Sequence, residues 1–165
     1  PGAKQFPAAA SLVVMDFCIT YFSTAVEATT EADILDIVAF SRTKNARLGI
    51  TGVLLYVNGS IVQVLEGQQQ SVEQLYESIR KDPRHTAVKT VIHQPIAQRL
   101  FGHWFMGYET LTTQQYQEVE NLLPRPGRSA AEGTPPQPII LEMLQRFFEI
   151  NHRPLPPKGA PQGSA

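Results

Sequence analysis

The sequence has few of the features that mark secreted, membrane-spanning or nucleic-acid-binding proteins. Cys18 is its single cysteine, which excludes an internal disulfide framework and a cysteine-rich zinc module, and it fits a reducing, cytoplasmic compartment. Lys and Arg number 14 against 15 Asp and Glu, so no basic excess favours a nucleic-acid or anionic-lipid partner. No apolar run approaches the roughly 20 residues that span a bilayer, and no basic-then-apolar leader opens the chain. We therefore expect a soluble protein with no membrane or nucleic-acid partner.

Proline is scarce in the middle of the chain. Of 13 prolines, only Pro83 and Pro95 lie between Met15 and Leu123. Proline interrupts helices and sheet ladders, so its distribution indicates one compact core over 15–123.

The flanking segments are predicted to contribute no second catalytic domain. Residues 1–14 lack an amphipathic period and are expected to be a tag or a disordered extension, and 124–138 is a Pro/Gly-rich linker. Residues 139–152 carry a narrow apolar stripe at helical spacing, and 153–165 has the composition of a disordered tail. The stripe predicts an amphipathic helix that either mediates a homo-oligomer or folds back onto the open face of its own sheet.

Alternation, caps and turn signals within the core predict five strands and three helices. In chain order these are a strand over 17–23, a helix capped by Thr30 and stopped by Gly49, strands over 51–57 and 60–66 joined by Asn58-Gly59, a helix over 71–81, strands over 88–94 and 104–108, and a helix over 111–123. This order is typical of an α+β, ferredoxin-like βαββαβ sandwich with a fifth strand. We expect a mixed sheet with two helices on one face, followed by C-terminal helices.

Three polar side chains are predicted to lie among apolar ones between the first helix and the sheet. Tyr21 and Gln63 each share a strand face with apolar residues, and central pairing of the first and third strands brings their side chains within reach of each other. Asn45 lies eleven residues after Ile34, close to three helical turns, and so faces the sheet. A buried polar group without a partner costs about 1 to 3 kcal/mol. The three groups therefore either satisfy one another or bind a flat ligand with donors and acceptors on its edge.

Structural roles compete with ligand binding at these positions. Tyr21 is also explained as a core tyrosine with its hydroxyl at the rim, and Asn45 as a partner of a backbone carbonyl near its helix end. Gln63 is harder to explain this way, because glutamine is seldom fully buried in the middle of a strand. Trp104 and Met106 share one face of the last predicted strand, where core packing is the ordinary role.

Five short motifs occur in a fixed order across the core. They are ITYFS around Tyr21, SRTKNARLGITG around Asn45, QVLEG from Gln63, DPRH from Asp82 and WFMGY from Trp104. No single motif is specific, but five in register over about 95 residues are a strong joint signal. Together they resemble the BLUF family, the flavin-binding blue-light sensor domains.

The resemblance implies a flavin cofactor, FAD or alternatively FMN, with its ring between the two helices that flank the sheet. It implies that Asn45 fixes the ring and that Gln63 bridges the flavin N5/O4 edge and the tyrosine. Tyr21 would give an electron and a proton to the flavin under blue light. Arg84 and His85 would line the ring and the ribityl side.

The resemblance further implies a photoreceptor that is not an enzyme. Rearrangement or tautomerisation of Gln63 would strengthen the hydrogen bond at the flavin C4 carbonyl and give a red-shifted signalling state. Trp104 and Met106 would compete for a place near Gln63 and relay the change to a downstream signalling protein. Lys44 departs from the family pattern, because a neutral side chain would contact the ring more readily, and it fits a solvated role.

Two other functions suit the same architecture. An acylphosphatase-like hydrolase needs a phosphate-binding loop after the first strand, but residues 24–28 contain neither glycine nor arginine. A non-flavin, ferredoxin-like binding module is the second alternative. The four histidines show no ligand spacing, so no metal site is predicted.

Overall fold

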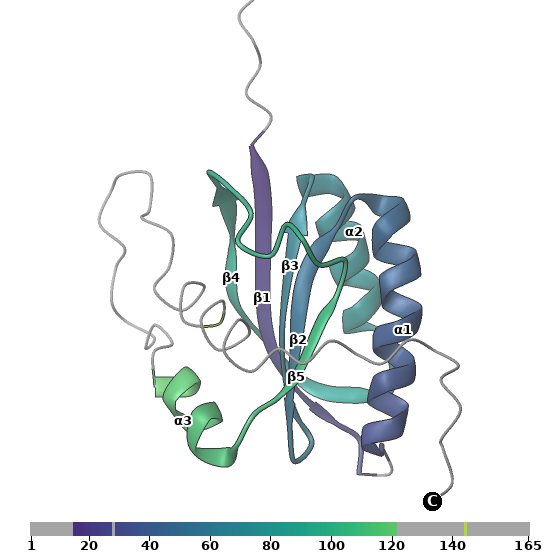
Figure 1. Ribbon diagram of the computed structural model, residues 1–165, viewed down its shortest axis with the longest axis vertical. Coiled ribbons are helices and arrows are strands. Elements are labelled where there is room, and N and C mark those ends of the chain that lie inside the picture. Colours follow the sequence, from purple (N-terminus) through teal and green to yellow (C-terminus); the bar gives the residue numbers. More distant parts are fainter. Residues whose placement is uncertain (1–14, 28, 122–143, 145–165) are drawn as a thin grey trace, which may run out of the picture.

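The computed structural model describes residues 15–27, 29–121 and 144, and the expectations for 1–14, 124–138, 153–165 and all but one residue of 139–152 lie outside this part. The elements are β1 (Asp16–Ala25), α1 (Glu31–Leu48), β2 (Thr51–Val57), β3 (Ser60–Gly67), α2 (Gln69–Arg80), β4 (His85–Ile96), β5 (Gly107–Thr110) and α3 (Thr113–Asn121). Their order confirms the predicted succession of strands and helices (Figure 1).

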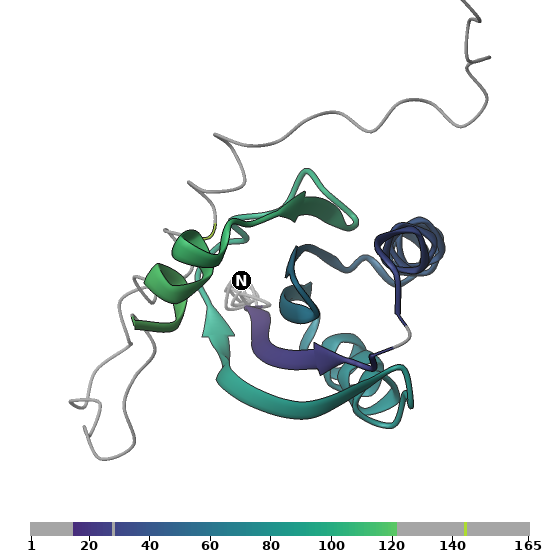
Figure 2. The ribbon, with the colours of Figure 1, turned by 90° about the horizontal axis from the view of Figure 1, so that it is seen from below.

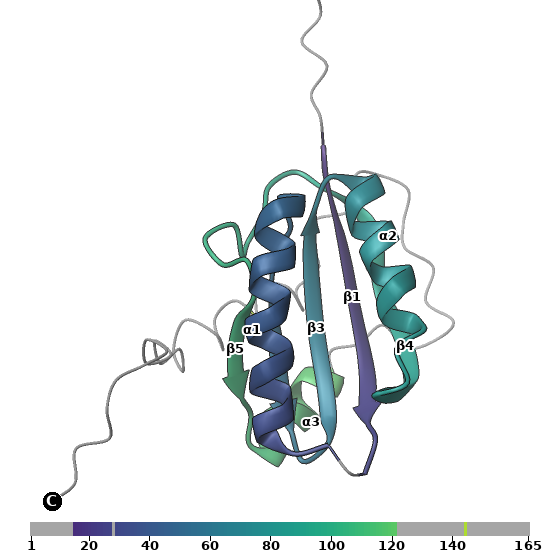
Figure 3. The same ribbon diagram turned by 90° about the vertical axis from the view of Figure 1, so that its right-hand side faces the viewer.

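The five strands form one mixed sheet in the order β4-β1-β3-β2-β5. Neighbouring strands are antiparallel except β2 and β5, which run parallel. Helices α1 and α2 lie side by side over one face of the sheet, and α3 lies beyond the other (Figures 2 and 3). This arrangement confirms the ferredoxin-like fold with a fifth strand. Among the residues that the structure describes, no helix is long and apolar enough to cross a membrane.

Local signals set the bounds of α1 and of the β2–β3 hairpin. The Thr30 hydroxyl accepts the N–H of Asp33, whose carboxylate accepts the Thr30 N–H, and α1 ends before Gly49. This capping box satisfies two N–H groups that the first helical turn leaves free. Asn58 and Gly59 have φ values of 44° and 85°, as a type I′ turn requires. Both predicted features are confirmed.

The last strand differs from its prediction. It begins at Gly107 rather than at residue 104. The backbone before it is turned, because the Trp104 N–H donates to the Phe101 carbonyl at 3.0 Å and the Trp104 carbonyl accepts the Gly52 N–H at 2.9 Å. Residues 97–106 are therefore an irregular connection, which we call the β4–β5 segment.

Each face of the sheet has its own hydrophobic cluster. The helix-side cluster, between the sheet and α1 and α2, includes Phe17, Ile19, Tyr21, Ile34, Val38, Leu54, Leu65, Leu75, Tyr76 and Met106. The far-side cluster includes Cys18, Phe22, Val53, Leu55, Val62, Val64, Phe101, Leu111, Val119 and Leu144. Cys18 thus packs on the face of the sheet opposite Tyr21. Leu144 is fully buried in the far-side cluster, so at this residue the C-terminal stripe contacts the sheet of its own chain.

Gly52 marks a close approach of β2 to β3. A Cβ atom at this position would lie 1.9 Å from the Val64 carbonyl oxygen, far inside contact distance. We expect Gly52→Ala to lower the free energy of unfolding by about 1 to 3 kcal/mol, because the two strands must separate to admit the methyl group. Urea denaturation measures this. Gly102→Ala is the control, since its nearest neighbour, Arg99 Cβ, would lie 3.5 Å away. Equal losses in the two variants would contradict the explanation.

Candidate cofactor site

Tyr21 and Gln63 face each other across the central strand pair. They are direct partners in the antiparallel β1–β3 register, both are buried, and the Tyr21 hydroxyl donates a hydrogen bond to Gln63 Oε1. Burial raises the pKa of Tyr21 far above its ordinary value, and the nearby Tyr76 and Asp82 raise it further. Tyr21 therefore keeps its proton and acts as a donor. This fixes the Gln63 amide with its oxygen toward Tyr21.

The nitrogen of the Gln63 amide points the other way, toward Met106. Gln63 Nε2 lies 3.4 Å from Met106 Sδ, which among the described residues is its one hydrogen-bond acceptor. A thioether is a weak acceptor, and Nε2 carries two hydrogens. The amide is thus well satisfied at its oxygen and poorly satisfied at its nitrogen.

Asn45 is buried on α1 and faces the same region. Its Nδ2 donates to the Phe105 carbonyl at 2.7 Å, so its backbone partner belongs to the β4–β5 segment and not to its own helix end. Within the described part of the chain no donor reaches Asn45 Oδ1. A buried amide oxygen without a donor is costly, which indicates that something else supplies the hydrogen bond.

These three residues line one cavity between α1, α2 and the sheet. It encloses about 850 Å³ of atom-free space, part of which is open to solvent. Its walls are mainly apolar and its polar groups converge from several elements, which is the usual character of a small-molecule site. The lining includes Tyr21, Ile34, Ile37, Phe40, Lys44, Asn45, Leu54, Gln63, Leu75, Arg84 and His85.

His85 forms a fixed part of the cavity wall. Its Nε2 lies 2.7 Å from the Ile79 carbonyl and its Nδ1 lies 2.9 Å from Ser23 Oγ. Because a carbonyl only accepts, Nε2 carries a hydrogen and donates it to Ile79, while Nδ1 pairs with the Ser23 hydroxyl. The ring packs edge-on against Tyr21 with 6.2 Å between centroids. His85 therefore offers a ring surface to the cavity, since both of its nitrogens already have protein partners.

Arg84 and Lys44 lie at the exposed edge of the cavity. The Arg84 guanidinium binds both carboxylate oxygens of Asp82 at 2.6 to 3.1 Å, and its side chain is 57% exposed. Hydrogen bonding to Arg84 lowers the pKa of Asp82, and the same bond raises that of Arg84. The charge of Arg84 is thus already paired. Lys44 is exposed, as its solvated role requires.

Met106 and Trp104 do not share a face, which corrects the sequence prediction. Met106 is buried in the helix-side cluster beside Gln63, whereas Trp104 packs partly buried against the far-side cluster, with its ring 6.5 Å from that of Phe101. Alternation along a strand does not apply to them, because both precede β5 in the turned segment. In this structure Met106 occupies the place beside Gln63.

Sequence reasoning missed three residues at this site. Tyr76 on α2 packs its ring 5.2 Å from that of Tyr21 and pairs its hydroxyl with Thr90 Oγ1 at 2.6 Å. Arg42 Nε donates to the Met106 carbonyl at 2.8 Å. The helical spacing of Tyr76 indicates only a core position, and the contribution of Phe105 is a backbone carbonyl, which leaves no mark in a sequence.

Comparison with known proteins identifies relatives of the same core. Residues 17–107 match the family described as BLUF, sensors of blue-light using FAD. Photoactivated adenylate cyclase subunit beta of Euglena longa is 46% identical over 83 residues, which are 50% of this chain and 10% of that protein. Its counterpart in Euglena gracilis is 43% identical over the same shares of the two chains. The chain thus spans about a tenth of the length of these curated relatives.

Solved structures of similar proteins share the fold. The dark-state structure of BlrB, a BLUF protein, is 30% identical with a TM-score of 0.64, covering 82% of this chain and 96% of that one. The photo-activated state of BlsA is 34% identical with a TM-score of 0.59, covering 66% and 79%. The family match spans more than half of the chain. The chain therefore belongs to the BLUF family of flavin-dependent blue-light sensor domains.

Proposed function

We propose that the cavity between α1 and α2 binds the isoalloxazine ring of FAD, with Asn45 and Gln63 meeting its polar edge. The observation that carries this assignment is the buried Asn45 Oδ1, which no donor of the described residues reaches. FMN is the alternative flavin; a solved structure of Klebsiella pneumoniae BlrP1, 25% identical with a TM-score of 0.59, is described with FMN. Both flavins present the same ring to these residues.

The residues present fit such a ring. Among the described residues, Asn45 Oδ1 receives no hydrogen bond, and Gln63 Nε2 is a donor whose partner is a thioether. A flavin edge carries both carbonyl acceptors and an N–H donor, so it complements the pair. The aliphatic side chains around them, among them Ile34, Leu54 and Leu75, suit the flat apolar faces of the ring.

The photochemical roles follow from the hydrogen-bond chain of Tyr21, Gln63 and Met106. Bound flavin supplies absorption of blue light and an oxidant for the Tyr21 phenol. The Tyr21 proton already points at Gln63 Oε1, so Gln63 is placed to pass or share it. A half-turn or tautomerisation of the carboxamide then exchanges donor and acceptor without moving the backbone.

The free-energy change of such a rearrangement is large enough to operate a conformational switch. Each exchanged hydrogen bond contributes about 1 kcal/mol, and a two-state balance shifts substantially with a few kcal/mol. All groups return to their starting state in the dark, so the proposed cycle consumes no substrate. We propose that the chain signals to a separate protein partner in the cytoplasm, rather than by catalysis of its own, and that Arg84 and His85 line the flavin outside its reactive edge.

Replacing Gln63 by Leu tests the photochemical assignment. Purified wild-type protein should be yellow, and its flavin bands should move slightly to the red under blue light and recover in darkness. Gln63→Leu and Tyr21→Phe should keep the flavin and lose the reversible shift, because each removes one member of the donor–acceptor pair. Gln117→Leu and Tyr116→Phe, both on α3, are the matched controls and should cycle normally. A normal cycle in either site variant would contradict the roles, and colourless protein that takes up neither FAD nor FMN would contradict the function.

Asn45 should contribute directly to flavin affinity. Asn45→Ala removes one hydrogen bond to the ring, and we expect the flavin dissociation constant to rise about tenfold. Fluorescence titration of the apoprotein measures it. Lys44→Ala changes the neighbouring, exposed residue and should leave the affinity within about twofold. Equal effects of the two substitutions would place Asn45 outside the flavin contact.

A homo-oligomer is the proposed state of the chain, on account of the apolar stripe over 139–152. Sedimentation velocity of the full chain at high micromolar concentration should give a mass above the 18.3 kDa of one copy. A monomer at that concentration would contradict the proposal. It would favour instead the packing of the stripe against its own sheet, an alternative supported by the burial of Leu144.

A further inference from the structure

The carboxylate of Glu66 is buried beside the far-side cluster, on the face of the sheet opposite the candidate site. Glu66 lies three residues after Gln63 on β3 and has no exposed surface. Alternation places the two side chains on opposite faces of the sheet. Glu66 Oε1 accepts the N–H of Leu100 at 3.0 Å, and Oε2 accepts the N–H of Phe101 at 2.9 Å. The proposed photochemistry makes no use of this group.

Both of these N–H groups belong to the β4–β5 segment, which carries Met106. Beyond Phe101, a series of hydrogen bonds fixes the backbone of the segment as it runs toward the helix side of the sheet. The Phe101 carbonyl accepts the Trp104 N–H, and the Trp104 carbonyl accepts the N–H of Gly52. Further along, the Phe105 carbonyl accepts from Asn45 Nδ2, and Met106 Sδ lies beside Gln63 Nε2. The fixed conformation of the segment thus extends from Glu66 on one face to Met106 on the other.

We propose that Glu66 is a positioning residue for the photocycle: by binding the Leu100 and Phe101 amides it holds the β4–β5 segment so that Met106 stays packed against Gln63. This role rests on the proposed function of Gln63. A carboxamide that turns in a closely packed interior needs its neighbours to give way. The more closely Met106 packs against Gln63, the more slowly Gln63 returns to its starting orientation after illumination. Glu66 controls this packing from the opposite face of the sheet, through the backbone of the β4–β5 segment.

Arg99 and Asp16 hold the same segment in another way. Arg99 donates to both carboxylate oxygens of Asp16, at 2.9 and 2.8 Å, and to the Gly49 carbonyl at 2.7 Å. Both side chains are partly exposed, at 26% and 31%. Solvent weakens such a surface pair, whereas the Glu66 bonds are made in a dry interior where an unpaired N–H has no water to replace its partner.

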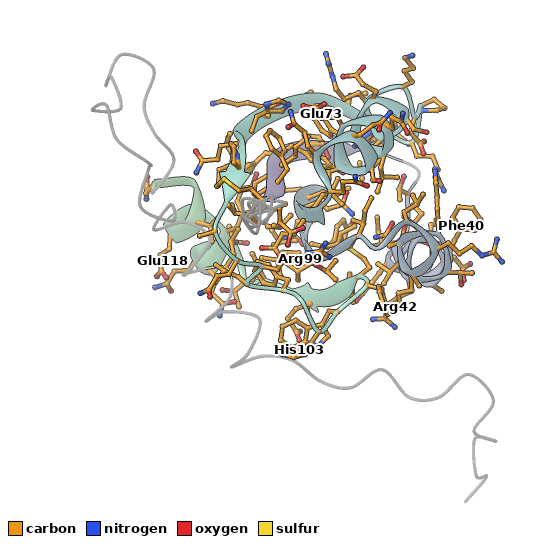
Figure 4. All side chains as sticks on the ribbon, turned by 90° about the horizontal axis from the view of Figure 1, so that it is seen from above. Phe40, Arg42, Glu73, Arg99, His103 and Glu118 are labelled. Carbon is orange, nitrogen blue, oxygen red and sulfur yellow. The ribbon has the colours of Figure 1, made fainter. Side chains whose placement is uncertain are left out.

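Glu66→Gln is the first test. The amide keeps the size of the side chain but presents an NH₂ group to one of the two backbone N–H groups, so one bond is lost. We expect dark recovery of the red-shifted state to accelerate about tenfold, the equivalent of one buried hydrogen bond. Glu118→Gln makes the same change at an exposed position of α3, on the side of the molecule away from Phe40 and Arg42 of α1 (Figure 4), and should recover at the wild-type rate. Equal rates for all three proteins, or slower recovery in Glu66→Gln, would overturn the proposal.

The acidity of Glu66 provides a second test, which the pH dependence of the wild-type protein can decide by itself. Burial raises its pKa to about 7, against the lowering effect of the Leu100 and Phe101 bonds and of Arg99, while Asp16 raises it. The other titratable group packed beside it is Cys18, whose pKa burial raises to about 12, so it stays a thiol. Protonation turns one Glu66 oxygen into a hydroxyl and weakens its hold on one amide. Wild-type recovery should therefore accelerate severalfold as the pH falls from about 8 to about 6, and Glu66→Gln should show no such step. A wild-type rate that is flat across this range would contradict the proposal even if the variant failed to fold.

A measurement in the dark separates this inference from the photoreceptor assignment. A ¹³C-methyl label on methionine gives one resonance for each of the chain's three methionines, and Met106→Leu identifies the resonance of Met106. In flavin-loaded wild-type protein the Met106 methyl resonance should shift with a midpoint near the Glu66 pKa of about 7. This shift should vanish in Glu66→Gln and persist in Glu118→Gln. If the wild type shows no light response, the photochemical assignment fails, whereas an unmoved Met106 resonance overturns the role of Glu66 whatever the light response is.

Discussion

The hydrogen bond from Tyr21 to Gln63 is the contact on which the site depends. It exists because β1 and β3 pair antiparallel with these two residues directly opposite each other. A shift of one residue in either strand would turn one of the two side chains into the far-side cluster. The Asn58-Gly59 turn fixes the register of β3 against β2, and β4 pairs with the other side of β1, so both residues lie on strands with a neighbour on each side.

The sheet separates two environments, and a single strand contributes to both, because Gln63 and Glu66 of β3 lie on opposite faces. On the helix side, Gln63 lies between a strong donor and a weak acceptor next to a cavity with a mainly apolar lining. On the far side, Glu66 receives two backbone amides from the β4–β5 segment. That segment passes from one face to the other and ends at Met106. A rearrangement of one carboxamide therefore has a short, hydrogen-bonded path to the opposite face, where Trp104 and Leu144 lie.

The sequence allowed the regular elements and the convergence of Tyr21, Gln63 and Asn45 on one face to be predicted, because those features depend on local period and on short-range turn chemistry. The capping box at Thr30 and the hairpin turn are of this kind. The prediction that Trp104 and Met106 share a face was wrong, because their placement depends on contacts with residues distant in the chain. The turn at Phe101 is held by Glu66 and Gly52, which are distant in the chain, so alternation within residues 104–108 carried no information about it. The pairing of Arg84 with Asp82 likewise depends on loop geometry.

If Gln63 rearranges under blue light as proposed, the hydrogen bond of the Tyr21 hydroxyl changes with it. Light-minus-dark infrared spectroscopy of protein carrying ring-labelled tyrosine tests this change most directly, with Tyr21→Phe identifying the band. We expect a pair of positive and negative bands from the Tyr21 C–O stretch that appears under blue light and decays at the rate of the flavin shift. A flavin shift without any band from Tyr21 would contradict it.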